Sequence, residues 1–186
     1  MSDMVFGLAL SLGALVLINQ PVADTNHLYL GLLVFGFSFL ILVTVWYNYS
    51  TVMAVLPVET RGLIIANLVL LFVVALEPYL LYVLVYAPAV VTEPDSVLYA
   101  LDLAVMNGVL GGFFHILSKE EKHLVAPHVV RNMRVRRDAT FALAAVFVLS
   151  ALPLFWTWAW TPGVPGRIIL WILTLPAGWI VRIVNR

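Results

Sequence analysis

Two carboxylates interrupt the apolar middle of the sequence. Glu77 and Asp102 each lie inside a long run of hydrophobic residues. A carboxylate inside a membrane is costly, and such residues commonly mark an ion pathway or a proton relay. The sequence therefore offers this pair as a cation-attracting vestibule or a proton site. The competing structural interpretation places each one near the membrane interface, protonated or hydrogen-bonded to Tyr or Asn within a helical bundle.

A stripe of leucines marks the first apolar segment. Leu8, Leu12 and Leu15 follow one another at helical spacing, and Ser11 lies on the shoulder of the stripe. Small residues, which let membrane helices approach closely, flank the stripe on both sides. They are Gly7 and Ala14 on the side of Ser11, and Ala9 and Gly13 on the other. Such a helix suits a pore built from symmetry-related copies, although a helix packed inside an ordinary bundle would show the same periodicity.

Motifs of the common enzyme classes are absent from the sequence. There is no His-Glu-x-x-His, P-loop or Gly-x-Ser-x-Gly pattern, and there is no cysteine. The histidines do not recur at metal-ligand spacing along one helix face, and the Thr-Val-Gly-Tyr-Gly filter of potassium channels is missing. We therefore predict neither an enzyme nor a metal or cofactor site. The net charge of zero gives no reason to expect a nucleic-acid partner.

The elements that position these residues are predicted to be membrane spans. Of the 186 residues, 63% are hydrophobic and only 11% are charged, whereas a soluble domain has about 25% charged residues. A helical span needs roughly 20 apolar residues, and breaks in the pattern leave six segments. They are Met4–Asn19, Leu28–Asn48, Gly62–Tyr86, Val97–Leu117, Ala139–Trp160 and Arg167–Val184. The expected fold is a single all-α, six-helix transmembrane domain over residues 1–186.

The basic residues predict the orientation. Nine of the ten Lys and Arg residues fall on alternate connections or the tail, and Arg167 alone borders the other side. The nine are Arg61, Lys119, Lys122, Arg131, Arg134, Arg136, Arg137, Arg182 and Arg186. Cytoplasmic loops carry the excess of basic residues, so both termini are expected in the cytoplasm. A polar cytoplasmic connection is predicted at about 118–138, which could form a helical extension or a surface helix. It would act as a solvated connector or, alternatively, make a lipid-headgroup or regulatory contact.

Three short motifs are spaced across the first three segments. Ser2 and Asp3 open the first, Trp46 and Asn48 end the second, and Asn67 precedes Pro78 in the third. These motifs resemble the transmembrane protein 175 family of potassium channels. That family has Arg-x-x-x-Phe-Ser-Asp, Trp-x-Asn-His-His and Asn…Pro-aromatic at the corresponding places. Here Tyr49 and Ser50 stand where the paired histidines would be, so the contacts of those histidines with the first helix are not expected to carry over unchanged.

The resemblance implies a homotetramer of six-helix subunits in a prokaryotic cell membrane. The four first helices would line the pore, with Leu8, Leu12 and Leu15 as hydrophobic rings and Ser11 as a hydroxyl ring. Potassium would be the permeant ion, with modest selectivity and no other cofactor. Two alternatives stay open at this point. One is a proton-coupled transporter or proton-permeable channel that uses Glu77 and Asp102, and the other is a membrane scaffold that transports nothing.

Overall fold

The structure is a computed structural model that describes residues 2–18, 25–56, 60–86, 93–119, 127–157, 159–161 and 164–174. Five helices are longer than four turns, and a short helix and a two-stranded hairpin follow them within the described part. They are α1 (Ser2–Ile18), α2 (Thr25–Met53), α3 (Arg61–Tyr86), α4 (Glu93–Leu117), α5 (Pro127–Ser150), α6 (Leu154–Thr157), β1 (Ala159–Thr161) and β2 (Val164–Pro165). Residues 166–174 form a further helical segment after β2.

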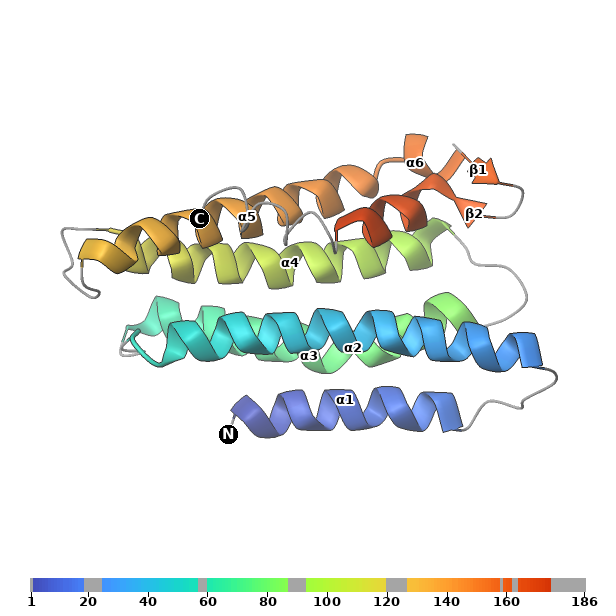
Figure 1. Cartoon of the computed structure of the whole chain (residues 1–186), viewed down its shortest axis with the longest axis horizontal. Coiled ribbons are helices and arrows are strands. Elements are labelled where there is room, and N and C mark those ends of the chain that lie inside the picture. Colours follow the sequence, from blue (N-terminus) through green and yellow to red (C-terminus); the bar gives the residue numbers. More distant parts are fainter. Residues whose placement is uncertain are drawn as a thin grey trace.

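The long helices stack in layers, as Figure 1 shows. α2 and α3 form the middle layer, with α4 and α5 on one side of it and α1 on the other. α1 packs against α2 and α3, while α4 packs along α5 and also on α3. α1 therefore lies at the edge of the bundle, and the other helices leave part of the α1 surface uncovered.

Local signals in the sequence explain where the middle helices begin. Thr60 precedes α3, and its Oγ1 accepts a hydrogen bond from the Leu63 backbone N–H at 3.4 Å, which is the usual role of an N-cap threonine. α4 begins Glu93-Pro94-Asp95. Proline is favoured at the first helical position because its missing N–H would have had no partner there. Carboxylates in the first turn also complement the positive end of the helix dipole.

The first four predicted segments match α1 to α4 to within a few residues, but the fifth does not. We expected a span over Ala139–Trp160, whereas α5 begins at Pro127 and ends at Ser150. Residues 127–138 of the predicted polar connection are thus helical. Pro153 explains the early end, since proline has no N–H to donate and its ring clashes with the carbonyl four residues before it.

Three helices are long and apolar enough to cross a membrane among the described residues. They run over Gly31–Met53, Arg61–Leu84 and Glu93–Leu117, while Ser2–Leu15 is a shorter apolar helix. Their outer faces carry large exposed hydrophobic side chains, including Leu33 at 72%, Ile65 at 61% and Phe72 at 65%. Apolar patches of this extent are rare on soluble monomers. The fold is therefore that of a helical membrane protein. Six spans stay a prediction, because residues 175–184 of the sixth lie outside the described part.

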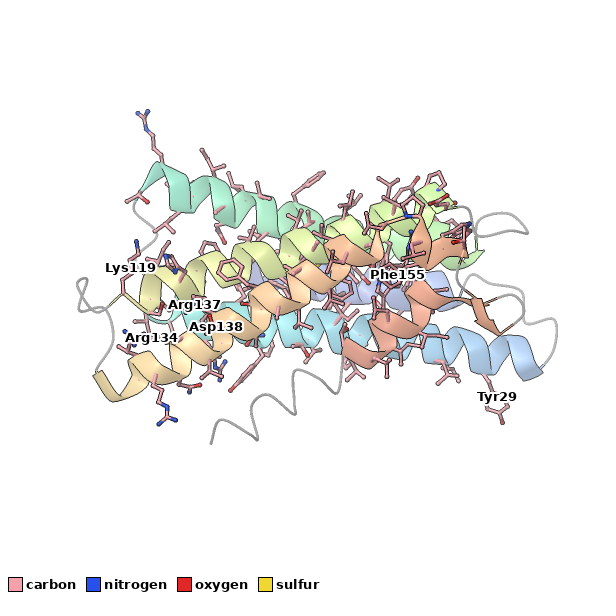
Figure 2. The ribbon with its side chains drawn as sticks, turned by 90° about the horizontal axis from the view of Figure 1, so that it is seen from above. Tyr29, Lys119, Arg134, Arg137, Asp138 and Phe155 are labelled. Carbon is pink, nitrogen blue, oxygen red and sulfur yellow. The ribbon has the colours of Figure 1, made fainter. Side chains whose placement is uncertain are left out.

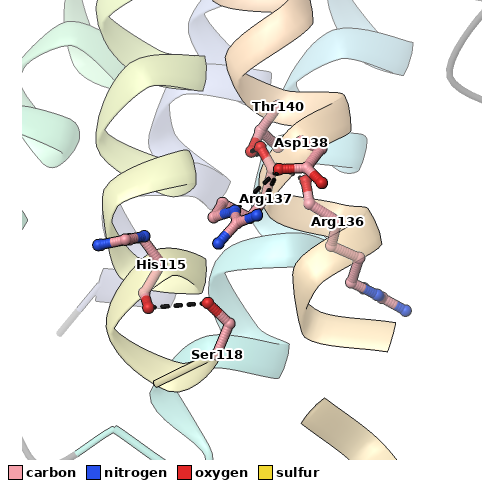
Figure 3. A network of polar contacts seen from close by, with 6 residues as sticks. All are labelled: His115, Ser118, Arg136, Arg137, Asp138 and Thr140. Carbon is pink, nitrogen blue, oxygen red and sulfur yellow. Dashed lines mark hydrogen bonds and ion pairs between the residues drawn. The ribbon is translucent and has the colours of Figure 1, made fainter. Parts of the chain in front are cut away.

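The two ends of the bundle differ in charge. Lys119, Arg134 and Arg137 gather at one end in Figure 2, whereas Tyr29 and Phe155 lie towards the other. The starts of α1, α3 and α5 share the basic end. Figure 3 shows local contacts there, among them the ion pair of Arg137 Nη2 with Asp138 Oδ1 at 2.8 Å. This polarity agrees with the basic asymmetry of the sequence.

Arg167, expected beside an outer loop, is instead completely buried. Its Nε donates to the Ser150 carbonyl at 2.6 Å, and its Nη2 donates to the carbonyls of Ala151 and Leu152 at 3.2 and 3.1 Å. Its Nη1 donates to the Ser96 hydroxyl, with the Glu93 carbonyl at 3.5 Å. The guanidinium thus caps the carbonyls at the end of α5 and joins them to the beginning of α4.

Candidate functional site

The leucine stripe of α1 faces away from its own subunit. Leu8, Leu12 and Leu15 have 59%, 40% and 50% of their surface exposed, and Ser11 is exposed beside them. The opposite face is packed, since Phe6 and Ala9 are 2% and 1% exposed. The stripe predicted from helical spacing is therefore a continuous apolar surface along α1 that the described part of the subunit does not cover.

The hydroxyl of Ser11 is bonded to its own helix. Its Oγ donates to the Gly7 carbonyl at 2.8 Å. A hydroxyl has one hydrogen to donate and two lone pairs that accept. Because the hydrogen is engaged with the backbone, the oxygen lone pairs remain directed away from that bond. This geometry presents an electron-rich oxygen on the exposed side of α1, at the shoulder of the leucine stripe.

The two small flanks of the stripe have different surroundings. A Cβ added at Gly13 would lie 3.5 Å from the Phe35 ring of α2, so this flank packs inside the subunit. Nothing lies within 4 Å of the corresponding position at Gly7, and Gly7 is exposed. The sequence predicted both flanks as contacts with neighbouring copies. The flank with Ala9 and Gly13 instead packs within the subunit, and the flank with Gly7 and Ser11 is open.

Residues of the first two motifs meet at the basic end of the bundle. The indole Nε1 of Trp46 donates to Asp3 Oδ1 at 3.1 Å, which joins α2 to the first turn of α1. One turn further along α1, the Phe6 ring packs on Tyr49 with centroids 5.5 Å apart. Ser2 is half-buried in the same turn as Asp3. The start of α1 is therefore fixed to α2 by a hydrogen bond and by an aromatic contact.

The polar residues at the end of α2 find partners that the sequence did not reveal. Asn48 is buried, and its Oδ1 accepts from Arg136 Nη1 of α5 at 3.2 Å. Tyr49 donates through its hydroxyl to Asn67 Oδ1 of α3 at 2.9 Å. The Arg136 guanidinium also lies over the Tyr47 ring, 5.5 Å from its centroid. Tyr49 thus joins α2 to α3 from one of the positions where the paired histidines were expected.

The two membrane carboxylates lie inside the subunit rather than on the leucine stripe. Glu77 is fully buried and Asp102 is 5% exposed. Pro78 follows Glu77 inside α3 and is buried as well. Neither carboxylate therefore borders the exposed side chains of α1. The described residues contain no group of three or more His, Asp or Glu side chains that could hold a metal ion.

Comparison with known proteins agrees with the resemblance seen in the motifs. The family model described as "Endosomal/lysosomal potassium channel TMEM175" matches residues 1–78. The match begins with α1, includes all of α2 and ends at Pro78 within α3. The predicted resemblance to this potassium channel family is thus confirmed over these residues. Neither a curated protein nor a solved structure gives a significant match to the chain.

Proposed function

We propose that this chain forms a potassium-permeable cation channel of modest selectivity, whose pore is lined by α1. The observation that carries the proposal is the uncovered leucine stripe of Leu8, Leu12 and Leu15. It lies on the helix at which the match to the potassium channel family begins. Ser11 places an exposed hydroxyl beside these leucines. A helix that faces lipid would gain nothing from that hydroxyl. A pore-lining helix gains a polar group at that place.

The edge position of α1 supports assembly from several copies. One helix per subunit cannot enclose a pore alone, so closed rotational symmetry must bring equivalent helices around one axis. The open flank with Gly7 and Ser11 offers a close approach for the α1 helix of the next subunit. The other flank already packs on Phe35 of the same subunit. A homotetramer, as the family resemblance implies, would place the four leucine stripes on the pore axis.

The side chains of the stripe would form the constriction. Rings of four leucines are narrow and apolar, so water is easily lost there and a hydrated cation finds no polar partner. Potassium gives up its hydration shell at a lower cost than sodium, which favours potassium at such a ring. A hydroxyl ring from Ser11 would offer partial compensation through its free lone pairs. Since no backbone carbonyl filter takes part, the selectivity is expected to be modest.

The basic end of the bundle supports a cytoplasmic location for the start of α1. Lys119, Arg134 and Arg137 lie at the same end as that start. Basic residues are retained on the cytoplasmic side of a membrane. We therefore propose a multi-pass protein of the cell membrane with a cytoplasmic amino terminus. The same rule, applied to Arg182 and Arg186, places the carboxyl terminus there too.

Ion flux from proteoliposomes tests the proposal. Purified full-length protein would be reconstituted with potassium inside, and efflux compared with that from liposomes loaded with sodium. We expect protein-dependent flux of both ions, faster for potassium, and a particle mass in nanodiscs of four chains. Strict proton flux without potassium flux would contradict the channel and favour a transporter. No flux of any ion would favour a scaffold.

A further inference from the structure

Two buried carboxylates, Glu77 of α3 and Asp102 of α4, lie near the same tyrosine, Tyr99. Glu77 is 0% exposed and Asp102 is 5% exposed. The Tyr99 hydroxyl of α4 donates to Glu77 Oε1 at 3.1 Å, which joins the two helices at this place. Tyr99 and Asp102 are three residues apart on α4, so their side chains are neighbours on that helix. The two acids and this tyrosine therefore form one buried cluster.

The two acids differ in their hydrogen bonds. Ser38 Oγ of α2 lies 2.9 Å from both carboxylate oxygens of Glu77, and the Tyr99 hydroxyl donates to Glu77 Oε1 at 3.1 Å. Donors of this kind stabilise the ionised form of a carboxyl group. Both oxygens of Asp102, in contrast, are buried and have no hydrogen-bond partner among the described residues. The structure thus supports a charge on Glu77 and gives no support to a charge on Asp102.

No cationic side chain in the described structure neutralises the pair. α5 has no ionisable residue from Ala139 to Ser150, and α2 has none from 30 to 46. Asp3 of α1 is bound to Trp46. Arg167 directs its donors to carbonyls and to the Ser96 hydroxyl instead. The other ionisable residues of α3 and α4 on this half of the bundle are Tyr79, Tyr82, Tyr86, Glu93, Asp95 and Tyr99, none of which carries a positive charge.

We propose that Glu77 and Asp102 form a buried proton-binding site that holds one proton per subunit, carried by the Asp102 carboxyl group. Two ionised carboxylates buried together without a cation would be strongly destabilising. A proton removes one charge and needs no further ligands. A metal ion would require several more oxygen atoms, but the hydroxyls of Ser38 and Tyr99 already donate to Glu77, and the described residues place no third His, Asp or Glu beside the pair.

Release of this proton would change the packing around α4. The Tyr99 ring lies on Trp171 with centroids 5.3 Å apart, and Trp171 Nε1 donates to Ser150 Oγ at 2.9 Å. The site is therefore linked by direct contacts to the end of α5 and to the segment 166–174. A second buried negative charge would oppose the packing of α3 on α4. Proton binding at this site gives the bundle a response to pH that is separate from the leucine stripe.

Infrared spectroscopy can count the proton directly. Full-length protein would be made by cell-free synthesis with aspartate carrying a carboxyl ¹³C label, reconstituted in liposomes and titrated from about pH 5 to about pH 10. We expect one carboxylic-acid carbonyl band from aspartate at about pH 7, equal to one proton per chain, and its loss at alkaline pH. Absence of that band at about pH 7 would overturn the proposal. A band that does not shift with the label would also overturn it, because the proton would then be on a glutamate.

Two variants complete the test. Asp102→Asn should remove the band, whereas Asp138→Asn, at an exposed aspartate, should leave it unchanged. Asparagine has the shape and neutrality of a protonated aspartate, so the proposal requires Asp102→Asn to fold, and failure to fold would contradict it. The folded site holds a proton that the unfolded chain releases, so the melting temperature of the parent should fall as pH rises, and that of Asp102→Asn should fall less. Since neither readout involves ion flux, failure here leaves the channel proposal untouched.

Discussion

Replacing Arg167 by lysine should destabilise the described bundle more than any other conservative change of a charged residue. The guanidinium is fully buried and donates to three carbonyls at the end of α5 and to the Ser96 hydroxyl. Lysine offers one compact ammonium group in place of this planar fork, so it cannot reach all of these acceptors at once. Its three donors leave at least one of the acceptors without its partner.

The expected magnitude follows from those contacts. A buried acceptor left without its partner costs about 1–3 kcal/mol, so losing one or two of them lowers the free energy of unfolding by about 1–6 kcal/mol. For a chain of this length, that corresponds to a fall in melting temperature on the order of 10 °C. Thermal unfolding in mild detergent, followed by circular dichroism, would measure it.

A matched control is available on α5. Arg131 is exposed, so the free energy of unfolding of Arg131→Lys should lie within about 0.5 kcal/mol of that of the parent, as is usual for surface substitutions. If Arg167→Lys unfolds at the same temperature as Arg131→Lys, the capping role assigned to Arg167 is wrong. The carbonyls at the end of α5 would then have other partners in the membrane.

Two further changes test how α1 is held. Gly7→Leu should leave the subunit fold intact but weaken assembly, because Gly7 is open in the subunit. Gly13→Leu should instead lower the free energy of unfolding by about 1–3 kcal/mol, because it overpacks the contact with Phe35. Native mass spectrometry and thermal unfolding separate the two effects. Trp46→Phe should cost about 0.5–1.5 kcal/mol by removing the hydrogen bond to Asp3, and a melting temperature equal to that of the parent would show that this bond does not hold α1.

The sequence was enough to predict the first four helices. Each is an apolar run closed by a polar or proline-containing break, and such runs depend only on local composition. The region after α5 was not predictable in this way. Pro153 lies inside the predicted fifth span, Ala139–Trp160, but it ends α5, and the hairpin of β1 and β2 follows. Arg167 looked like a loop charge because its carbonyl partners lie 15 to 17 residues earlier in the chain.

The candidate site was likewise predictable from the sequence only in part. The stripe of Leu8, Leu12 and Leu15 was predictable because helical periodicity alone places these residues on one face. Which small flank packs inside the subunit was not, since that depends on how α1 sits against α2. The partner of Asn48 was equally hidden, because Arg136 lies 88 residues further along the chain. Only the packing of α5 along α4, which itself packs on α2, brings the two side chains together.

The most direct test of the central claim is ion flux after shortening the leucines of the stripe. Leu8→Ala, Leu12→Ala and Leu15→Ala would each be reconstituted in liposomes, and potassium and sodium flux measured beside the parent. Leu10→Ala is the matched control, because Leu10 packs against the core of the subunit. A wider and wetter ring should raise flux by about tenfold in at least one variant, which needs the barrier to fall by only about 1.4 kcal/mol. That variant should also discriminate less between the two ions, and Leu10→Ala should conduct like the parent. If all three variants conduct like the parent while Glu77→Gln or Asp102→Asn abolishes transport, α1 does not line the pore.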